Sequence, residues 1–106
     1  MILCERGIRT FESSTRSSLD LSSIPVLKKL THLPVIVDPS HAAGRKDIIP
    51  ALSKAAIAVG ADGLLIEVHH DPENAKCDGM QALLPEEFSH LVDDLKKVAH
   101  SLGRAI

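Results

Sequence analysis

The order of apolar segments predicts an α/β fold built on a parallel sheet. Three short apolar runs, at 1–7, 33–38 and 63–69, each end in polar residues. Segments with helical spacing of apolar residues separate them, and such alternation is typical of parallel strands joined by right-handed crossovers. Of the residues, 44% are hydrophobic and 25% charged, the balance of an ordinary globular chain. The 106 residues include only two aromatic side chains, so we expect an aliphatic core.

The three apolar runs have the composition of strands. In 33–38 and 63–69, compact runs of Val, Ile and Leu precede the polar residues, as in parallel strands that are covered on both faces. The segment 1–7 shows the same order of apolar residues, then charged residues and glycine. We therefore predict three strands.

Three segments carry apolar residues at spacings of three and four and are predicted helices. The first runs from Ser23 to before Pro34, the second covers 48–59, and the third begins at Pro85 and ends before Gly103. Serine is a favoured N-cap, proline is tolerated in the first turn, and glycine is common just after the last turn.

Charge and cysteine content exclude several classes of protein. The formal net charge is −2 and aromatic stacking platforms are absent, so nucleic-acid binding is not expected. The apolar runs are too short to cross a bilayer, which favours a cytoplasmic protein. Cys4 and Cys77 lack zinc-finger spacing and are expected as reduced thiols. Cys4 is predicted in the core, and Cys77 is a weaker alternative as a metal ligand.

Polar residues follow each predicted strand, at the edge where parallel sheets place their chemistry. Glu67 lies within an apolar strand and therefore needs a partner, either an Arg or Lys side chain or a site shared with His69 on the same face. His41 follows the second strand, where Pro39 stiffens the turn. With Asp78, His41 and Glu67 offer one nitrogen and two oxygen ligands, a set suited to Mn, Fe, Co or Zn.

Arginines and small residues mark a candidate anion site. Arg6 follows the first strand, and the small-residue loop 42–46 leads into a predicted helix. Free backbone N–H groups and the helix dipole favour a phosphate at such a position. Arg45, within this loop, is a candidate phosphate contact or a solvated charge.

Several ordered motifs resemble one enzyme family over essentially the whole chain. They are Cys-Glu-Arg-Gly-Ile-Arg-Thr-Phe-Glu at 4–12, Asp-Pro-Ser-His-Ala-Ala-Gly-Arg at 38–45, Ile-Glu-Val-His at 66–69 and Asp-Gly-Met-Gln at 78–81. These strings and their spacing resemble the 3-deoxy-7-phosphoheptulonate synthases, in particular the type I beta branch of bacteria and archaea.

The resemblance implies a fold and a reaction. Members of this family are (β/α)8 TIM barrels that condense phosphoenolpyruvate with D-erythrose 4-phosphate and water. The products are 3-deoxy-D-arabino-heptulosonate 7-phosphate and phosphate, in the first step of the shikimate pathway to the aromatic amino acids.

The resemblance also implies roles for particular residues. Carried over by position, His41, Glu67 and Asp78 would be the ligands of a divalent metal ion. Arg6 would bind phosphoenolpyruvate, and Arg45 is a weaker candidate for a phosphate contact. Asp38 and His41 would be catalytic, with Asp38 near the aldehyde and the metal.

Two features of the family are missing from this sequence. Its fourth metal ligand is a cysteine near the end of the first barrel strand, and a Lys-Pro-Arg-Thr loop that binds both substrates follows soon after; Cys4 belongs to the motif of a later strand. We therefore expect residues 1–106 to be the C-terminal part of a barrel of about 250 residues. These residues would form strands six to eight of the barrel and would have little or no synthase activity alone. The full-length enzyme is expected to be a homo-oligomer.

Two other readings stay open. The first is a fragment of 3-deoxyoctulosonate 8-phosphate synthase, a sibling that uses arabinose 5-phosphate and shares the Glu-Arg-Gly motif. The second is a non-catalytic module that associates with copies of itself or binds metal or phosphate without turnover.

Overall fold

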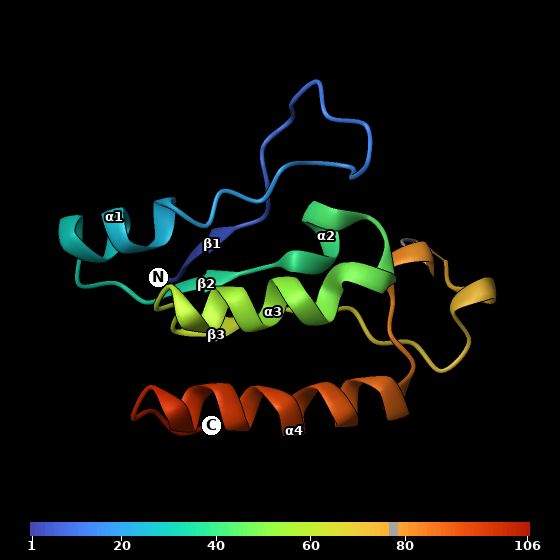
Figure 1. Ribbon diagram of the computed structural model, residues 1–106. Helices are drawn as coiled ribbons and strands as arrows, with labels where there is room; N and C mark the ends of the chain where they lie inside the picture. Colours follow the sequence, from blue (N-terminus) through green and yellow to red (C-terminus); the bar gives the residue numbers. More distant parts are fainter. Residues whose placement is uncertain (77–78) are drawn as a thin grey trace.

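The predicted α/β fold with a parallel sheet is confirmed. The computed structural model describes residues 1–76 and 79–106. Its three strands pair in parallel in the order β1-β2-β3 (Figure 1). The strands are β1 (Leu3–Glu5), β2 (Val35–Val37) and β3 (Gly63–Leu64). The helices are α1 (Ser23–Leu30), α2 (Pro39–Ala43), α3 (Ile49–Ala58) and α4 (Pro85–Ser101), with 3-10 turns at Lys46–Ile48, Pro72–Asn74 and Gly79–Gln81.

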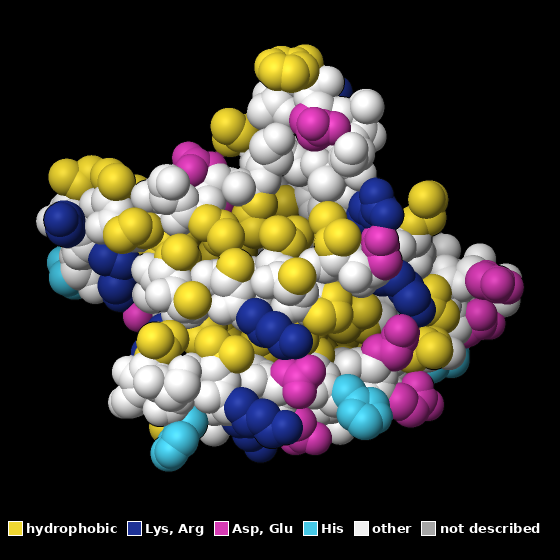
Figure 2. Space-filling model, viewed as in Figure 1, with side chains coloured by type: hydrophobic (Ala, Val, Ile, Leu, Met, Phe, Trp, Pro, Cys, Tyr) yellow, Lys and Arg dark blue, Asp and Glu magenta, His cyan; other side chains and the backbone are white. Residues whose placement is uncertain are grey.

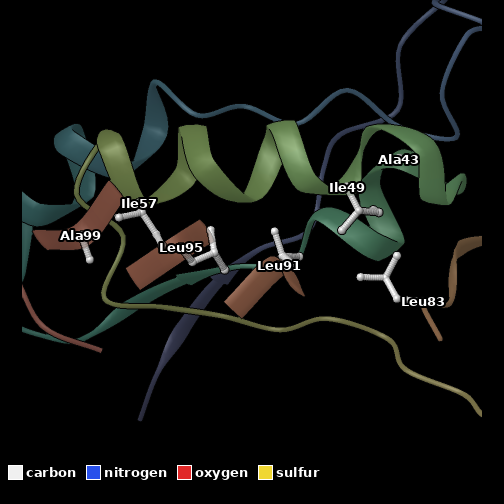
Figure 3. Packing of buried hydrophobic residues seen from close by; sticks show 7 residues of the cluster. All are labelled: Ala43, Ile49, Ile57, Leu83, Leu91, Leu95 and Ala99. Atoms are coloured by element: carbon white, nitrogen blue, oxygen red, sulfur yellow. The ribbon is translucent and has the colours of Figure 1, made fainter. Parts of the chain in front are cut away.

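The core lies between one face of the sheet and the helices. Val35 and Val37, on the same face of β2, are fully buried in a cluster with Ile24 of α1 and Ala56 of α3. A second cluster joins α3 to α4, which lie side by side in Figure 1. Figure 3 shows its members, which are Ala43, Ile49, Ile57, Leu83, Leu91, Leu95 and Ala99.

The opposite face of the sheet is not covered by these helices. Cys4, Ile36 and Gly63 are register partners on that face, and Leu65 follows it with 50% of its surface exposed. The prediction that Cys4 is a core residue is wrong, because its thiol projects from the uncovered face and is exposed. Partial desolvation and the negative charge of Asp38 raise the pKa of this thiol.

The strands are shorter than predicted because β2 turns away early. Beyond Val37 the chain enters α2, so the segment after Leu64 has no β2 partner beyond the bond from the Leu65 N–H to the Val37 carbonyl. The chain at Glu67–His69 instead pairs with Leu83, through the bond from the Leu83 N–H to the Glu67 carbonyl and from the His69 N–H to the Leu83 carbonyl. Only two residues of the predicted strand 63–69 are therefore in β3.

A complete short helix, α2, forms where the sequence analysis expected a turn. Asp38 caps it, since its Oδ1 accepts from the N–H of His41 at 2.9 Å, and Pro39 occupies its first turn. Gly44 ends it with φ +68°, a left-handed conformation that glycine adopts readily. His41 therefore lies on a helix directly after β2.

Charged side chains mark the outer surface. Figure 2 shows Lys, Arg, Asp, Glu and His side chains gathered over α4, with hydrophobic side chains above it. Within residues 1–76 and 79–106, no helix has the length and apolar character required to span a bilayer.

Candidate active site

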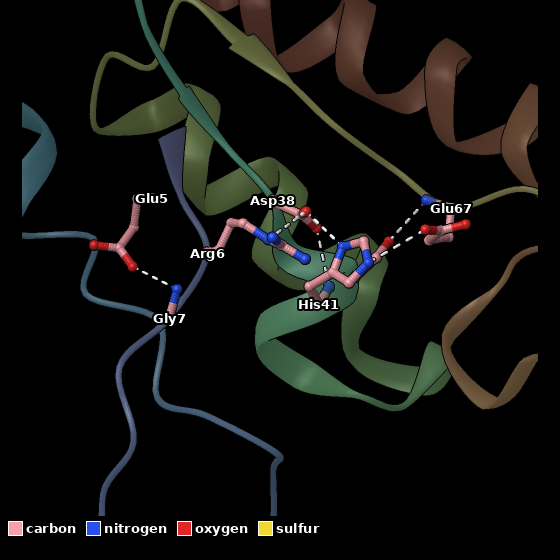
Figure 4. A network of polar contacts seen from close by, with 7 residues as sticks. Glu5, Arg6, Gly7, Asp38, His41 and Glu67 are labelled. Atoms are coloured by element: carbon pink, nitrogen blue, oxygen red, sulfur yellow. Dashed lines mark hydrogen bonds and ion pairs between the residues drawn. The ribbon is translucent and has the colours of Figure 1, made fainter. Parts of the chain in front are cut away.

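Three polar residues from neighbouring strand ends meet at the carboxyl edge of the sheet. Arg6 follows β1, Asp38 follows β2, and Glu67 lies three residues after β3. His41 joins them from α2, and Figure 4 shows its ring between Asp38 and Glu67. The parallel strand order explains this meeting, because parallel strands present their carboxyl ends at one edge.

The carboxylate of Asp38 is the centre of the cluster. Its side chain is fully buried, and its Oδ2 lies 2.6 Å from Nδ1 of His41 and 3.4 Å from Nε of Arg6. Oδ1 accepts from the backbone N–H of His41. A buried carboxylate is costly unless it is paired and hydrogen-bonded, and these contacts supply both conditions.

The Asp38 contact favours one tautomer of His41. A carboxylate only accepts hydrogen bonds, so Nδ1 carries the proton that it donates to Asp38, and the lone pair of the neutral ring lies on Nε2. Nε2 lies 3.3 Å from Oε1 of Glu67. Two ligand atoms at zinc-like distances from one ion in tetrahedral geometry are about 3.4 Å apart. This nitrogen and oxygen pair therefore fits two ligands of a divalent metal ion.

Glu67 is less buried than its apolar neighbours indicate. Its side chain is 37% exposed, and within residues 1–76 and 79–106 its ion-pair partner is His41 when that ring is protonated, rather than an Arg or Lys. Its backbone N–H donates to Oγ of Ser40 at 3.0 Å, and its carbonyl accepts from Leu83. The expected burial fails because the strand ends before Glu67 is reached.

The alternative that His69 shares the Glu67 site has no support among the contacts of His69. The ring of His69 stacks on that of His70, with centroids 4.8 Å apart. Its Nδ1 accepts from the N–H of Asp71 at 2.9 Å. These contacts tie His69 to the loop that follows it.

Arg45 lies outside the cluster of Arg6, Asp38, His41 and Glu67. Its guanidinium donates two bonds of 2.5 Å to Asp47, and a third reaches the carbonyl of Ser14. The bidentate pair holds the pKa of Asp47 below and that of Arg45 above its ordinary value. A phosphate at Arg45 would have to compete with Asp47.

Backbone hydrogen bonds connect the loop after β1 to α2. Backbone N–H groups of Arg16 and Ser17 donate to the carbonyls of Ala43 and Ala42. The carboxylate of Glu5 accepts from the N–H of Gly7 at 2.5 Å, so it supports the turn that carries Arg6. These contacts hold the loop that carries Arg6 beside His41.

Sequence reasoning missed Ser40 and Glu5 as supporting residues. Both stand inside the recognised motifs, next to residues with predicted roles, and this adjacency is the one signal that could have identified them. Ser40 is fully buried, which sequence alone does not reveal.

The third predicted ligand, Asp78, lies outside the described residues, as does Cys77. Across residues 1–76 and 79–106, no group of three or more His, Cys, Asp and Glu side chains could hold a metal ion. The structure thus brings together two of the three predicted ligands, with Arg6 and Asp38 beside them.

A groove outside this cluster is lined by β3 and α4. It has a volume of about 470 Å³ and is lined largely by apolar side chains such as Leu65, Phe88 and Val92. None of Arg6, Asp38, His41 and Glu67 lines it. The polar cluster is therefore separate from this groove.

Comparison with known proteins identifies related sequences. Residues 1–102 match the model of the DAHP synthetase I family. A phospho-2-dehydro-3-deoxyheptonate aldolase from Thermotoga maritima is 56% identical over 103 residues, which are 97% of this chain and 30% of that protein. A 2-dehydro-3-deoxyphosphooctonate aldolase from Geotalea uraniireducens is 34% identical over 109 residues, covering 92% of this chain and 39% of that protein.

Solved structures agree with the fold. The crystal structure of the Thermotoga maritima DAHP synthase superposes with a TM-score of 0.96 over 98% of this chain and 31% of that chain. A truncated form of the enzyme gives a TM-score of 0.95 and is covered to 40%. The chain thus spans about a third of the length of these relatives.

Proposed function

Because the chain belongs to the DAHP synthetase I family, we propose that it forms part of the active site of a 3-deoxy-D-arabino-heptulosonate 7-phosphate synthase. The observation that carries the proposal is the 3.3 Å approach of His41 Nε2 to Glu67 Oε1, with Nδ1 held by Asp38. In this proposal residues 1–106 correspond to strands six to eight of a (β/α)8 barrel, in a cytoplasmic protein that is a homo-oligomer at full length.

The proposed metal ligands are His41, Glu67 and Asp78. A divalent ion of the Mn, Fe, Co or Zn class would act as a Lewis acid on the aldehyde of erythrose 4-phosphate. His41 offers Nε2 and Glu67 offers Oε1 from two different segments, so a folded chain is needed to present them together. Asp38, which is buried, would orient His41 rather than touch the aldehyde.

Arg6 would bind phosphoenolpyruvate. Its side chain is 58% exposed beside Asp38, so the guanidinium can donate to an anion on its open side. C3 of phosphoenolpyruvate attacks the aldehyde carbon, whose oxygen takes up a proton, and water adds at C2 with loss of a proton. The C2–O bond to phosphate then breaks, so inorganic phosphate leaves with that oxygen and the new hydroxyl on C2 becomes the ketone. The positive charge of Arg6 offsets the anions that this step brings together. Arg45 stays a weaker candidate for a phosphate contact.

A chimaeric enzyme tests the proposal. Residues 1–103 would replace the matching segment of the Thermotoga maritima enzyme, and phosphate release from phosphoenolpyruvate would be measured with erythrose 4-phosphate or arabinose 5-phosphate. We expect turnover with erythrose 4-phosphate and its loss in a His41→Ala variant. A preference for arabinose 5-phosphate would instead support the octulosonate enzyme, which the 34% identical relative keeps as the second candidate.

The isolated chain should show little or no turnover. The same assay with 106 residues, both substrates and Mn²⁺ is expected to release no phosphate above the background of the His41→Ala variant. Phosphate release by the isolated chain would contradict this expectation. Metal binding by an inactive chimaera would favour the non-catalytic module.

A further inference from the structure

The hydroxyl of Ser40 joins α2 to the segment that carries Glu67. Ser40 is fully buried, and its Oγ accepts from the backbone N–H of Glu67 at 3.0 Å. The bond spans 27 positions in the sequence and links two elements that are not strand partners.

Glu67 depends on this bond because the sheet no longer holds it. The last bond from this segment to β2 is donated by the N–H of Leu65 to the carbonyl of Val37. At Glu67 the carbonyl accepts from Leu83, whereas the N–H is held by Ser40. Removing the hydroxyl would leave a partly buried N–H without its acceptor, and the segment would have to shift to reach another.

The same turn of α2 also fixes His41. Asp38, the N-cap of α2, accepts hydrogen bonds from the backbone and the ring of His41. Ser40 directly precedes His41 in the same helix. One short helix therefore sets both ends of the 3.3 Å separation between His41 Nε2 and Glu67 Oε1. The orientation of ligands by such supporting hydrogen bonds commonly changes metal affinity by about 10–100-fold.

We propose that Ser40 is a positioning residue that holds Glu67 at ligating distance from His41. This inference rests on the proposed metal site. It adds a specific role to a serine that is not itself a ligand and that binds the backbone of its target rather than the side chain.

The test compares two fully buried serines. Ser53, on α3, is buried like Ser40, but its Oγ has no hydrogen-bond partner within residues 1–76 and 79–106. Ser40→Ala and Ser53→Ala remove the same atoms from similar depths. Affinity for Co²⁺ would be measured from its visible absorption, and folding from circular dichroism and thermal unfolding.

We expect Ser40→Ala to weaken Co²⁺ binding by about 10–100-fold, while Ser53→Ala leaves it unchanged. Ser40→Thr, which keeps the hydroxyl, should bind within a few-fold of the parent chain. Equal Co²⁺ affinity in a folded Ser40→Ala variant and the parent would overturn the inference. If the alanine variant does not fold, Ser40→Cys, which keeps a side chain of similar size but is a much weaker hydrogen-bond acceptor, replaces it under the same criteria.

A second measurement separates this inference from the proposed function. Hydrogen exchange at the amide of Glu67, followed by NMR without metal, should be at least about 10-fold faster in Ser40→Ala than in the parent, and unchanged in Ser53→Ala. Unchanged exchange in a folded Ser40→Ala chain would count against Ser40. Absence of Co²⁺ binding by the parent would instead count against the metal site, whatever the exchange shows.

Discussion

The buried Asp38 carboxylate lies 2.6 Å from Nδ1 of His41 and directs the opposite nitrogen of the ring toward Glu67. The two residues are three positions apart, so the contact depends on the chain turning into α2 immediately after β2. A carboxylate that accepts from one imidazole nitrogen leaves the other as the ligand, an arrangement that recurs in metal sites. The geometry assigns Asp38 control of the His41 tautomer.

Asp38→Asn should weaken metal binding by about 10–100-fold. The amide oxygen can still accept from the backbone N–H of His41. The amide NH₂ would then face Nδ1 and donate to it, so the ring proton would move to Nε2. That proton occupies the lone pair proposed to bind metal. Co²⁺ titration measures the affinity, and ¹⁵N NMR of the imidazole reports the tautomer.

The control for Asp38→Asn is Asp47→Asn, which removes a carboxylate paired to Arg45 outside the cluster. Its Co²⁺ affinity should match that of the parent chain. A folded Asp38→Asn variant with the proton still on Nδ1 and full affinity would show that Asp38 does not set the tautomer.

Arg6→Ala should weaken phosphoenolpyruvate binding in the chimaeric enzyme by about 10–100-fold. The reason is the loss of charge-assisted hydrogen bonds, worth about 1.5–3 kcal/mol. Arg9→Ala, three residues along the same exposed loop, removes an equal charge. Isothermal titration calorimetry with phosphoenolpyruvate would compare the two. Equal losses in both variants would indicate general electrostatic attraction rather than a specific contact at Arg6.

Gly44→Ala should destabilise the chain more than Gly103→Ala, although both glycines have similar positive φ values of 68° and 73°. The left-handed backbone costs alanine about 1–3 kcal/mol at either position. At Gly44 the added Cβ would also lie 2.8 Å from Cβ of Arg16, whereas at Gly103 it meets nothing within 4 Å.

Urea unfolding of both glycine variants measures the difference. Overpacking adds about 1–3 kcal/mol, so Gly44→Ala should lose at least about 1 kcal/mol more than Gly103→Ala. Equal losses would mean that the loop carrying Arg16 moves away from α2 without cost.

Asp62 should make stability sensitive to acid. Its carboxylate accepts from Nζ of Lys28 at 2.6 Å and from the N–H of Val35 at 2.8 Å, and both bonds hold its pKa below the ordinary value of 3.8. A folded-state pKa below the unfolded one stabilises the fold above pH 3.8. That contribution is lost as the pH falls through the lowered folded value.

Asp62→Asn should therefore reduce the loss of stability below pH 4, while lowering stability near neutral pH. The urea midpoint of unfolding, measured at several pH values, should fall less steeply below pH 4 in this variant than in the parent chain. Asp93→Asn, on the exposed side of α4, controls for the loss of one negative charge. If the urea midpoint of Asp62→Asn falls below pH 4 as steeply as that of the parent chain, the Asp62 pair does not contribute to the acid sensitivity.

The sequence by itself determined the α/β class, the three parallel strands and the order of the helices, because aliphatic runs and helical spacing are local properties of the chain. Its motifs also singled out Arg6, Asp38, His41 and Glu67, which the structure brings to one edge. Strand lengths could not be predicted, since they depend on where β2 turns into α2 and leaves its neighbour without a partner.

Only the tertiary structure decided how these residues act on one another. Exposure of Cys4 and partial exposure of Glu67 follow from which sheet face the helices cover and where β3 ends. The bond between Ser40 and Glu67 joins residues 27 positions apart, which no local pattern indicates. Sequence specifies the groups that can bind and react, whereas their distances arise from long-range packing of the whole chain.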